Sequence, residues 1–418
     1  MRIVIGLGGG IAAYKATMLL RLFSKAGHDV VAIPTEAALK FVGKPTLEAL
    51  SGNLVSTSVF DRVEDVNHVR QAELADAVVI APATADLMAR LAQGRANDLL
   101  SATVLTTHAP VILAPAMHTQ MWEHPATQKN VHDLKEYGYH VIPPVHGRLT
   151  GPDSGVGRMP EPEDIFTQAL GIIEKSTKSA MNQLPLAHRK LIITAGGTRE
   201  PLDPVRYLGN NSSGKQGIAL AQAARSMGAE VTLICAHAEV AMPENIHVVR
   251  VSTALEMKAA VEKYSPTADA LIMAAAVADF RAARYEEYKI KKASDSADAP
   301  TITLVRNPDI LRETVESRHP GSKPHVIVGF AAETGSAHQS VLQLGKEKLE
   351  RKGCDLLAVN RVGNGAGFGS DTNELIILNR FNDQEIHSTG NKADVSADLL
   401  HEVAKFLADL HLSHQPES

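Results

Sequence analysis

The sequence predicts an α/β protein with two doubly wound parallel-sheet domains in tandem. A short β-branched strand runs into clustered glycines twice, once in "RIVIGLGGG" from Arg2 and again in "KLIITAGG" from Lys190. The length agrees with this reading, because 418 residues exceed one ordinary domain. We therefore expect a nucleotide-type fold to begin at each glycine cluster.

Strand-like and helix-like runs alternate through the first half. Residues 2–6 are typical of a buried strand, and a helical pattern follows until Gly27. Further strands are expected in "DVVAIPTEA", "DAVVIAPATAD" and "APVILAPAM". Strands separated by helices form a parallel sheet, and ligands bind at the carboxyl ends of its strands.

Three consecutive glycines, Gly8, Gly9 and Gly10, follow the first strand. Such residues let the backbone approach a phosphate at a helix N-terminus. The alternative is a tight strand–helix turn that binds no ligand. The dinucleotide pattern G-x-G-x-x-G fails, because its last glycine is replaced by Ile11. A mononucleotide such as FMN therefore fits better than NAD.

The overall composition excludes several classes of protein. A net charge of −5 and 4% aromatic residues do not favour a nucleic-acid partner. The two cysteines, Cys235 and Cys354, are too few for a disulfide framework or a cysteine zinc site. We see no signal-peptide pattern and no run of about 18 apolar residues, so we expect a cytoplasmic protein without a membrane partner.

Two further segments of the first half contain chemically interesting residues. "APAMHTQMW" places a histidine beside methionines and the single tryptophan, just after a strand. His68 lies where an amphipathic helix is expected to begin. Taken alone, the methionines and tryptophan favour core packing, and an isolated histidine is more often structural than catalytic.

Taken together, five motifs of residues 1–170 resemble the flavin-dependent phosphopantothenoylcysteine decarboxylases. This resemblance implies an FMN enzyme that oxidises the thiol side of a C-terminal cysteine to a thioaldehyde, so that CO2 leaves easily. The resulting ene-thiolate is then protonated and reduced again by the flavin. The motifs are "GGGIAAYK", "NHVRQAELAD", "APATADLMARLAQGRANDLL", "APAMHTQMWEHPATQKN" and "GPDSGVGRMPEP".

The resemblance also implies roles for single residues. His68 matches the histidine that acts in acid–base chemistry or stabilises the thiolate, a role that suits an imidazole. Thr35, Thr84 and Ser101 match strand-end positions that contact the flavin. Gly8 stands where the family's phosphate loop commonly has a serine, which leaves more of the binding to backbone N–H groups.

Two departures from the family pattern concern catalysis. His118 replaces the asparagine that binds the substrate carboxylate, and a protonated His118 could still do so. The flap cysteine that protonates the ene-thiolate is absent, and the aligned position is near Gly151. Asp153, His146, His118 or water could donate the proton instead. We expect decarboxylation to be retained; the alternative is an active ligase whose flavin domain has lost or reduced activity.

The second half begins after "EKSTKSAMNQLPLAHRK", which reads as a helix end plus a linker. We therefore predict domains at 1–185 and 186–418. Later strands are expected in "ADALIMAAAVADF", "HVIVGFAAET", "LLAVNRV" and "NELIILNRF". In this half, the second strand is not followed by the acidic residue that binds the ribose of a dinucleotide, so NAD is again disfavoured.

Polar clusters of the second half suggest a triphosphate site. They lie in "NNSSGKQG", "KIKK", "NPDIL" and "KEKLERKGCD", although "KIKK" alone is more typical of a solvated surface. Lysines can neutralise phosphates, and a metal ion can bridge the oxygens of the leaving pyrophosphate. The site would differ from a P-loop, because no G-x-x-x-x-G-K-[ST] occurs.

These clusters, with "AAAVADF" and "VGFAAET", closely resemble phosphopantothenate–cysteine ligase over about residues 190–405. The resemblance implies that the phosphopantothenate carboxylate attacks the α-phosphate of CTP, and that the cysteine amine then displaces CMP from the acyl-cytidylate. Asn210 would hold the carboxylate, Lys289 would stabilise the charged phosphate, and Mg2+ would act through ligands that remain unknown. The expected CTP site consists of Asp279, Lys289, Asn307, Pro308, Asp309, Ile310, Phe330, Lys348 and Lys352.

The whole chain thus resembles the bifunctional enzymes of coenzyme A biosynthesis, with flavodoxin-like or Rossmann-like domains. The implied partners are 4′-phosphopantothenate, cysteine and CTP. The family implies a homo-oligomer, with trimeric flavin domains, often four trimers to a dodecamer, and dimeric ligase domains. A rival from another class is a regulatory binding protein that keeps the flavin fold, and the absence of CTP-dependent pyrophosphate release would favour it. A third reading, an NAD-linked dehydrogenase, would be excluded by a flavin absorbance spectrum.

Overall fold

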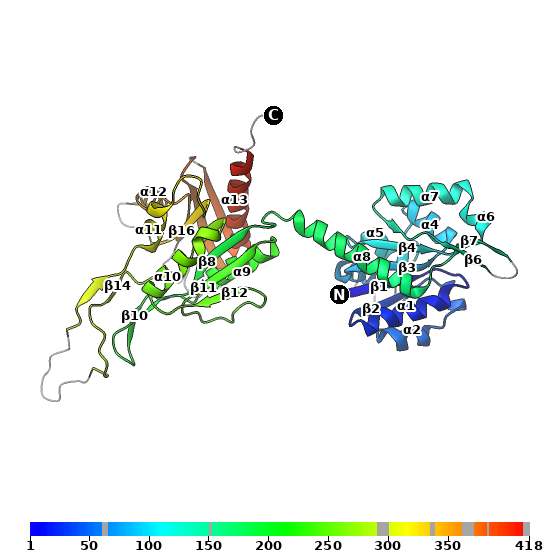
Figure 1. Cartoon of the computed structure of the whole chain (residues 1–418), viewed down its shortest axis with the longest axis horizontal. Coiled ribbons are helices and arrows are strands. Elements are labelled where there is room, and N and C mark those ends of the chain that lie inside the picture. Colours follow the sequence, from blue (N-terminus) through cyan, green and yellow to red (C-terminus); the bar gives the residue numbers. More distant parts are fainter. Residues whose placement is uncertain are drawn as a thin grey trace. The chain divides into compact units, whose positions relative to one another are not determined.

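The computed structural model divides into two compact units, Met1–Ala180 and Met181–Ser418. Each unit is considered by itself, and Figure 1 shows its elements. No helix among the described residues is long and apolar enough to cross a membrane. The structure describes residues 1–60, 66–149, 153–290, 301–334, 339–361, 372–382 and 384–412.

The first unit contains a five-stranded sheet of order β2-β1-β3-β4-β5. All its strand pairs are parallel, so the predicted parallel sheet is confirmed. The winding reverses between β1 and β3, which is the point where open α/β sheets bind ligands. The strands are β1 (Arg2–Leu7), β2 (Asp29–Pro34), β3 (Ala77–Ala83), β4 (Val111–Pro115) and β5 (His140–Val141).

Helices cover both faces of this sheet, which explains why β1 is continuously apolar after Arg2. Ile3 and Ile5 pack toward α1, α2 and α8, whereas Val4 packs toward α4, α5 and α7 (Figure 1). A parallel strand buried on both faces needs such a continuous apolar run. The helices are α1 (Ala13–Lys25), α2 (Lys44–Ser51), α3 (Asn67–Leu74), α4 (Ala85–Ala92), α5 (Leu99–Thr106), α6 (Thr119–Trp122), α7 (Pro125–Glu136) and α8 (Pro162–Asn182).

An antiparallel hairpin of β6 (Val145–Arg148) and β7 (Ser154–Arg158) packs beside α6. Glycines permit this close approach. A Cβ atom at Gly155 would lie 2.2 Å from Thr119 Oγ1, and one at Gly157 would lie 2.2 Å from the carbonyl oxygen of Met117. The Met117 N–H also donates to the Gly157 carbonyl at 3.0 Å. The hairpin is therefore held against the segment that follows β4.

The second unit contains an eight-stranded sheet of order β12-β11-β8-β13-β16-β17-β18-β19. The first six strands in this order are parallel and follow the Rossmann order 3-2-1-4-5-6. These strands are β8 (Lys190–Ala195), β11 (Glu230–Cys235), β12 (His247–Arg250), β13 (Ala270–Met273), β16 (Val326–Glu333) and β17 (Leu356–Arg361).

The last two strands depart from the predicted parallel arrangement. β18 (Thr372–Asn379) and β19 (Glu385–Asn391) each run antiparallel to the preceding strand. The connections are too short for parallel pairing, because residues 362–371 join β17 to β18 and residues 380–384 join β18 to β19. A parallel return needs a crossover of a dozen or more residues.

Helices again cover both faces of the second sheet. Ile193 packs with α9 and α13, whereas Ile192 packs with α10. Leu186, the first residue of the predicted second domain, is fully buried in this core. The helices are α9 (Lys215–Ser226), α10 (Ala254–Tyr264), α11 (Ile310–Ser317), α12 (Val341–Lys352) and α13 (Lys392–Leu412). Two ribbons complete the unit: β9 (Arg199–Pro201) with β10 (Tyr207–Gly209), and β14 (Phe280–Ala282) with β15 (Leu304–Arg306).

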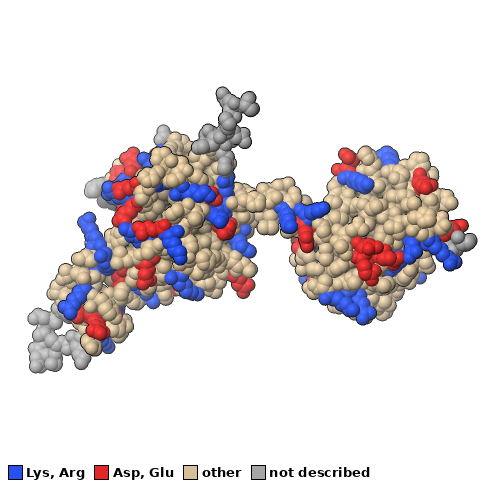
Figure 2. All heavy atoms as spheres, viewed as in Figure 1, with Lys and Arg blue, Asp and Glu red and all other residues tan. Residues whose placement is uncertain are grey.

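Charged residues of both signs are interspersed over the faces seen in Figure 2. This distribution agrees with the small net charge of −5. A basic stripe, which a nucleic-acid-binding surface needs, is not visible on those faces.

Candidate functional site

The first cleft, of about 1380 Å³, opens at the carboxyl ends of β1 to β4. Each strand contributes residues just past its end: Gly9 and Gly10 after β1, Thr35 after β2, Thr84 after β3 and His118 after β4. Residues far apart in the sequence thus meet at one edge of the sheet. This is the edge where the sequence predicted a ligand.

The glycine turn between β1 and α1 has two different parts. Gly8 is buried away from the cleft wall, its N–H donates to the Pro82 carbonyl at 3.0 Å, and a Cβ there would lie 2.5 Å from that oxygen. A Cβ at Gly9 would lie 2.3 Å from the Ala37 Cβ. Within the described residues, no hydrogen bond occupies the N–H groups of residues 9–12. These groups, at the N-terminus of α1, form a site suited to an anion.

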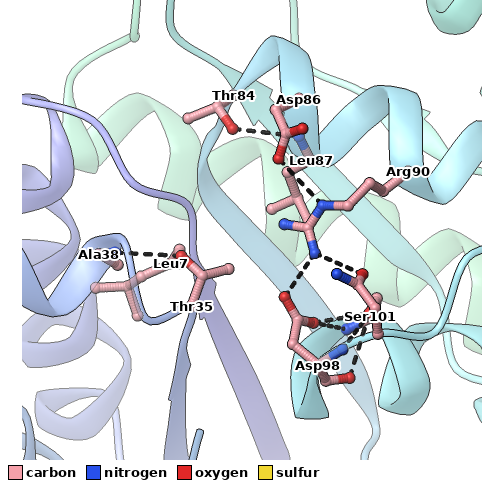
Figure 3. Close-up of polar contacts among 10 residues, drawn as sticks. Leu7, Thr35, Ala38, Thr84, Asp86, Leu87, Arg90, Asp98 and Ser101 are labelled. Carbon is pink, nitrogen blue, oxygen red and sulfur yellow. Dashed lines mark hydrogen bonds and ion pairs between the residues drawn. The ribbon is translucent and has the colours of Figure 1, made fainter.

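The three predicted hydroxyl contacts differ in their availability (Figure 3). Thr35 Oγ1 donates to the Leu7 carbonyl at 3.1 Å and accepts from the Ala38 N–H, and Thr84 Oγ1 caps α4 by accepting from the Leu87 N–H. Both threonines line the cleft. Ser101 does not, because it is fully buried and its Oγ is bonded to Asp98 Oδ1 at 2.7 Å.

An ionic network that the sequence reasoning missed lies in the same wall (Figure 3). Arg90 contacts Asp98 at 2.7 Å, Asn97 at 2.9 Å and Asp86 at 3.1 Å. Burial alone would raise the pKa of Asp98, but hydrogen bonds from Arg90 and Ser101 outweigh it and hold this pKa below its ordinary value. The only sequence signal was the position of Asp98 before an apolar helical run, where it caps α5.

The structure brings only one of the predicted decarboxylation residues into the first cleft. His118 lines it. His68 lies on α3 outside the lining, although its Nδ1 is buried and has no hydrogen-bond partner among the described residues. Asp153 and His146 are exposed on the hairpin outside the lining, and Gly151 lies beyond the described residues.

The second cleft, of about 1090 Å³, lies at the carboxyl ends of β13, β16 and β17. Nine of the ten predicted ligase residues line it, and Lys289 is the exception. Lys289 is exposed in a segment whose next residue, Ile290, is held by Asp203 and Arg206. The nine are Asn210, Asp279, Asn307, Pro308, Asp309, Ile310, Phe330, Lys348 and Lys352.

Two asparagine amides shape the wall of the second cleft after β13. Asn210 Nδ2 donates to the Val277 carbonyl at 2.9 Å, and Asn307 Nδ2 donates to the Ala278 carbonyl at 2.8 Å. The N–H of Asn307 also donates to the Asp279 carbonyl. The segment between β13 and β14 is thereby fixed in the wall of the second cleft.

The two lysines of α12 are already paired in the second cleft. Lys348 Nζ lies 2.9 Å from Glu333 Oε1, and Lys352 Nζ contacts Asp309. A bound triphosphate would compete with these carboxylates for the ammonium groups. Among the described residues, no cluster of three or more His, Cys, Asp or Glu side chains could hold a metal ion.

Two side-chain amides that line the second cleft and bond to each other were also missed. Asn373 Nδ2 donates to Gln216 Oε1 at 2.8 Å, and Gln216 Nε2 donates to Ser396 Oγ at 2.9 Å. Gln216 belongs to the "NNSSGKQG" cluster, but Asn373 and Ser396 come from β18 and α13. No local pattern marked them.

Comparisons with known proteins agree with the two-part organisation. The family model "Flavoprotein" matches residues 1–174, and the model "DNA/pantothenate metabolism flavoprotein C-terminal domain" matches residues 186–407. The coenzyme A biosynthesis bifunctional protein CoaBC of Mycobacterium bovis is 51% identical over 97% of both chains. That of Haemophilus influenzae is 42% identical over 96% of both chains.

The chain belongs to the family of bifunctional coenzyme A biosynthesis proteins. It is a flavoprotein and an enzyme with two activities, a ligation and a decarboxylation. The resemblance, the fold class and the bifunctional nature predicted from the sequence are thus confirmed, and the alternative of a lost decarboxylase is not favoured.

Solved structures of related proteins match one unit at a time. The C-terminal domain of a coenzyme A biosynthesis bifunctional protein CoaBC is 29% identical, with a TM-score of 0.45, and covers 54% of this chain and 100% of that one. A mutant PPC decarboxylase complexed with pantothenoylaminoethenethiol is 31% identical, with a TM-score of 0.39, and covers 41% of this chain and 98% of that one.

Proposed function

We propose that residues 1–185 bind FMN and decarboxylate 4′-phosphopantothenoylcysteine, and that residues 186–418 make this compound from 4′-phosphopantothenate, cysteine and CTP. The observation that carries the proposal is the meeting, in the second cleft, of nine predicted residues from five separate sequence motifs. Equivalent support in the first unit comes from the strand-end residues of its cleft.

The residues of the first cleft fit FMN. The N–H groups that begin α1 can receive its phosphate, while the narrow space at Gly9 excludes any side chain there. Thr35 and Thr84 lie at the neighbouring strand ends. When bound, the flavin supplies the oxidation of the thiol and its later reversal.

The chain's own residues bind the substrate and move protons. His118, exposed in the cleft wall, meets the substrate carboxylate through a charge-assisted hydrogen bond. His68 serves in acid–base chemistry although it lies outside the lining of the first cleft, and its buried Nδ1, which has no partner among the described residues, supports this role. For the proton that returns to the ene-thiolate, the candidates are His118, Asp153, His146 and water.

In the second cleft, the phosphopantothenate carboxylate attacks the α-phosphate of CTP and expels pyrophosphate. The cysteine amine then attacks the acyl-cytidylate, forming the amide and releasing CMP. Asn210 orients the carboxylate, and the backbone around Asn307 reads the cytosine edge. Lys289 stabilises phosphate charge from an exposed segment, and Mg2+ enters bound to the triphosphate.

One reconstituted assay tests both halves. The protein is mixed with FMN, 4′-phosphopantothenate, cysteine, CTP and Mg2+, and pyrophosphate and CO2 are followed. We expect His68→Asn to abolish CO2 release while pyrophosphate release continues. Asn210→Asp should block amide formation, yet decarboxylate supplied 4′-phosphopantothenoylcysteine normally.

His118→Ala and Asp153→Ala are measured alongside to identify the proton donor. Normal CO2 release by His68→Asn would refute the role of that histidine. Protein that makes 4′-phosphopantothenoylcysteine but never releases CO2 would refute the decarboxylase, and failure to use CTP would refute the ligase.

We extend the proposal to a homo-oligomer. Ile11, just before α1, and Tyr14 and Met18 on α1 are 60%, 56% and 47% exposed, next to the first cleft. Such an apolar face supports association between copies. Light scattering gives the mass, and a monomer at micromolar concentration would contradict this part.

A further inference from the structure

A charged cluster links α1 of the first unit to its hairpin. It consists of Lys15 on α1, Arg158 at the end of β7 and Glu161 before α8, and we call it the clasp. Lys15 Nζ donates to Glu161 Oε1 at 3.0 Å and to the Met159 carbonyl at 3.1 Å. Arg158 Nη2 donates to the same Glu161 oxygen at 2.5 Å.

The Lys15 side chain is only 7% exposed, whereas Glu161 is 48% and Arg158 is 41% exposed. A buried ammonium is costly without partners, so Lys15 strongly requires Glu161 and the carbonyl. The exposed pair of Arg158 and Glu161 would contribute little by itself. Lys15 is therefore the member that fixes the clasp.

Both cations of the clasp line the first cleft, but Glu161 does not. The backbone carbonyl of Glu161 also accepts hydrogen bonds from the N–H groups of Asp164 and Ile165. These bonds fix Glu161 to the start of α8. The carboxylate thus holds Arg158 from outside the cleft. On the other side, the hairpin rests on the segment around His118 through Gly157.

We infer that Lys15 is a positioning residue for decarboxylation: through Glu161 it holds Arg158 and the β6–β7 hairpin against the first cleft, so that the Arg158 guanidinium faces an anionic substrate. This inference rests on the proposed decarboxylation for its substrate. The clasp itself is a property of the hairpin and can be measured without turnover.

The test compares Lys15→Met with Lys25→Met, which removes an exposed lysine from the last turn of the same helix. Glu161→Gln is a second route to the same loss. Hydrogen exchange of the β7 amides reports the hairpin, and flavin absorbance reports bound FMN. The KM and kcat of CO2 release report decarboxylation, and CTP-dependent pyrophosphate release reports the second unit of the same molecule.

We expect Lys15→Met and Glu161→Gln each to raise β7 exchange and the decarboxylation KM by about tenfold or more, as expected for loss of a hydrogen bond between charged groups. Flavin content and pyrophosphate release should stay within about twofold of the wild-type values. A twofold change corresponds to a free-energy difference below about 0.5 kcal/mol. Lys25→Met should match wild type throughout.

Unchanged β7 exchange in Lys15→Met would overturn the inference, whatever happens to activity. Loss of FMN with a protected hairpin would also overturn it, because Lys15 would then bind the cofactor directly. If the wild type shows no CO2 release, the proposed function fails, while β7 exchange still decides whether the clasp holds the hairpin.

Discussion

Arg90 organises one wall of the first cleft through its contacts with two carboxylates. Arg90 joins the first turn of α4 to the cap of α5 through Asp86 and Asp98. The two carboxylates differ sharply, because the Asp86 side chain is 81% exposed and that of Asp98 is 17% exposed. Only the Asp98 contact is sheltered enough to matter for stability.

This contrast predicts a pH dependence. The pKa of Asp98 is lowered in the folded state, so its stabilisation is complete above the unfolded-state value of about 3.9 and is lost as pH falls through the lower folded value. We expect Asp98→Asn to destabilise the first unit by about 1–3 kcal/mol at pH 7 and to flatten the loss of stability below pH of about 4.

Urea unfolding of the first unit between neutral and acidic pH measures this effect. Asp86→Asn is the matched control, since it removes the exposed partner of the same arginine. Equal effects of the two substitutions would show that burial of Asp98 is unimportant.

The two cysteines illustrate a second point at the residue scale. Both are buried in the second unit, and burial raises the pKa of Cys354 to about 11. Burial also raises the pKa of Cys235. Neither thiol is therefore poised to act as an acid or nucleophile near neutral pH.

At the scale of elements, two glycines of the first unit differ in whether the structure requires a glycine at their position. Gly157 in β7 has φ +155° and sits against the Met117 carbonyl, whereas Gly171 lies inside α8 with open space around its missing Cβ. Gly157 is required because the Met117 carbonyl oxygen leaves no space for a Cβ atom. Gly171 only weakens a helix.

The same substitution should therefore change stability in opposite directions. We expect Gly171→Ala to raise the free energy of unfolding by about 0.5–1 kcal/mol, because alanine is the better helix former. Gly157→Ala should lower it by roughly 1–3 kcal/mol through backbone strain. Thermal unfolding measures both, and a stabilised Gly157→Ala would contradict the packing of hairpin on α6.

Most elements were predictable because their signals are local. Both strand–glycine starts, at Arg2 and Lys190, coincide with β1 and β8. The antiparallel direction of β18 was not predicted, because an apolar strand reads the same whichever way it pairs. Only the short connection to β17 fixes that direction.

At the scale of the whole molecule, the chain has separate cores. Leu186 and the residues after it pack in the second unit, and the buried clusters of the first unit end within α8. Each unit surrounds its own sheet with helices. Such units are expected to unfold as separate cooperative transitions.

We expect calorimetry of the full chain to show two transitions. FMN should raise the midpoint of one, and CTP with Mg2+ the other, because a ligand stabilises the unit that binds it. Gly171→Ala serves to assign the first unit, since it should shift only the FMN-sensitive transition. One transition that responds to both ligands would contradict independent units.

The sequence alone determined the two α/β units, the strand ends at the first cleft and nine residues that line the second cleft, because strands, turns and motifs are encoded by neighbouring residues. Tertiary structure decided which side chains meet. Lys15 and Glu161 are separated by 146 positions, and Gln216 and Asn373 by 157. It also kept Ser101 and His68 outside the first cleft lining. Such contacts arise only when buried charges and amides must find partners as distant segments pack together.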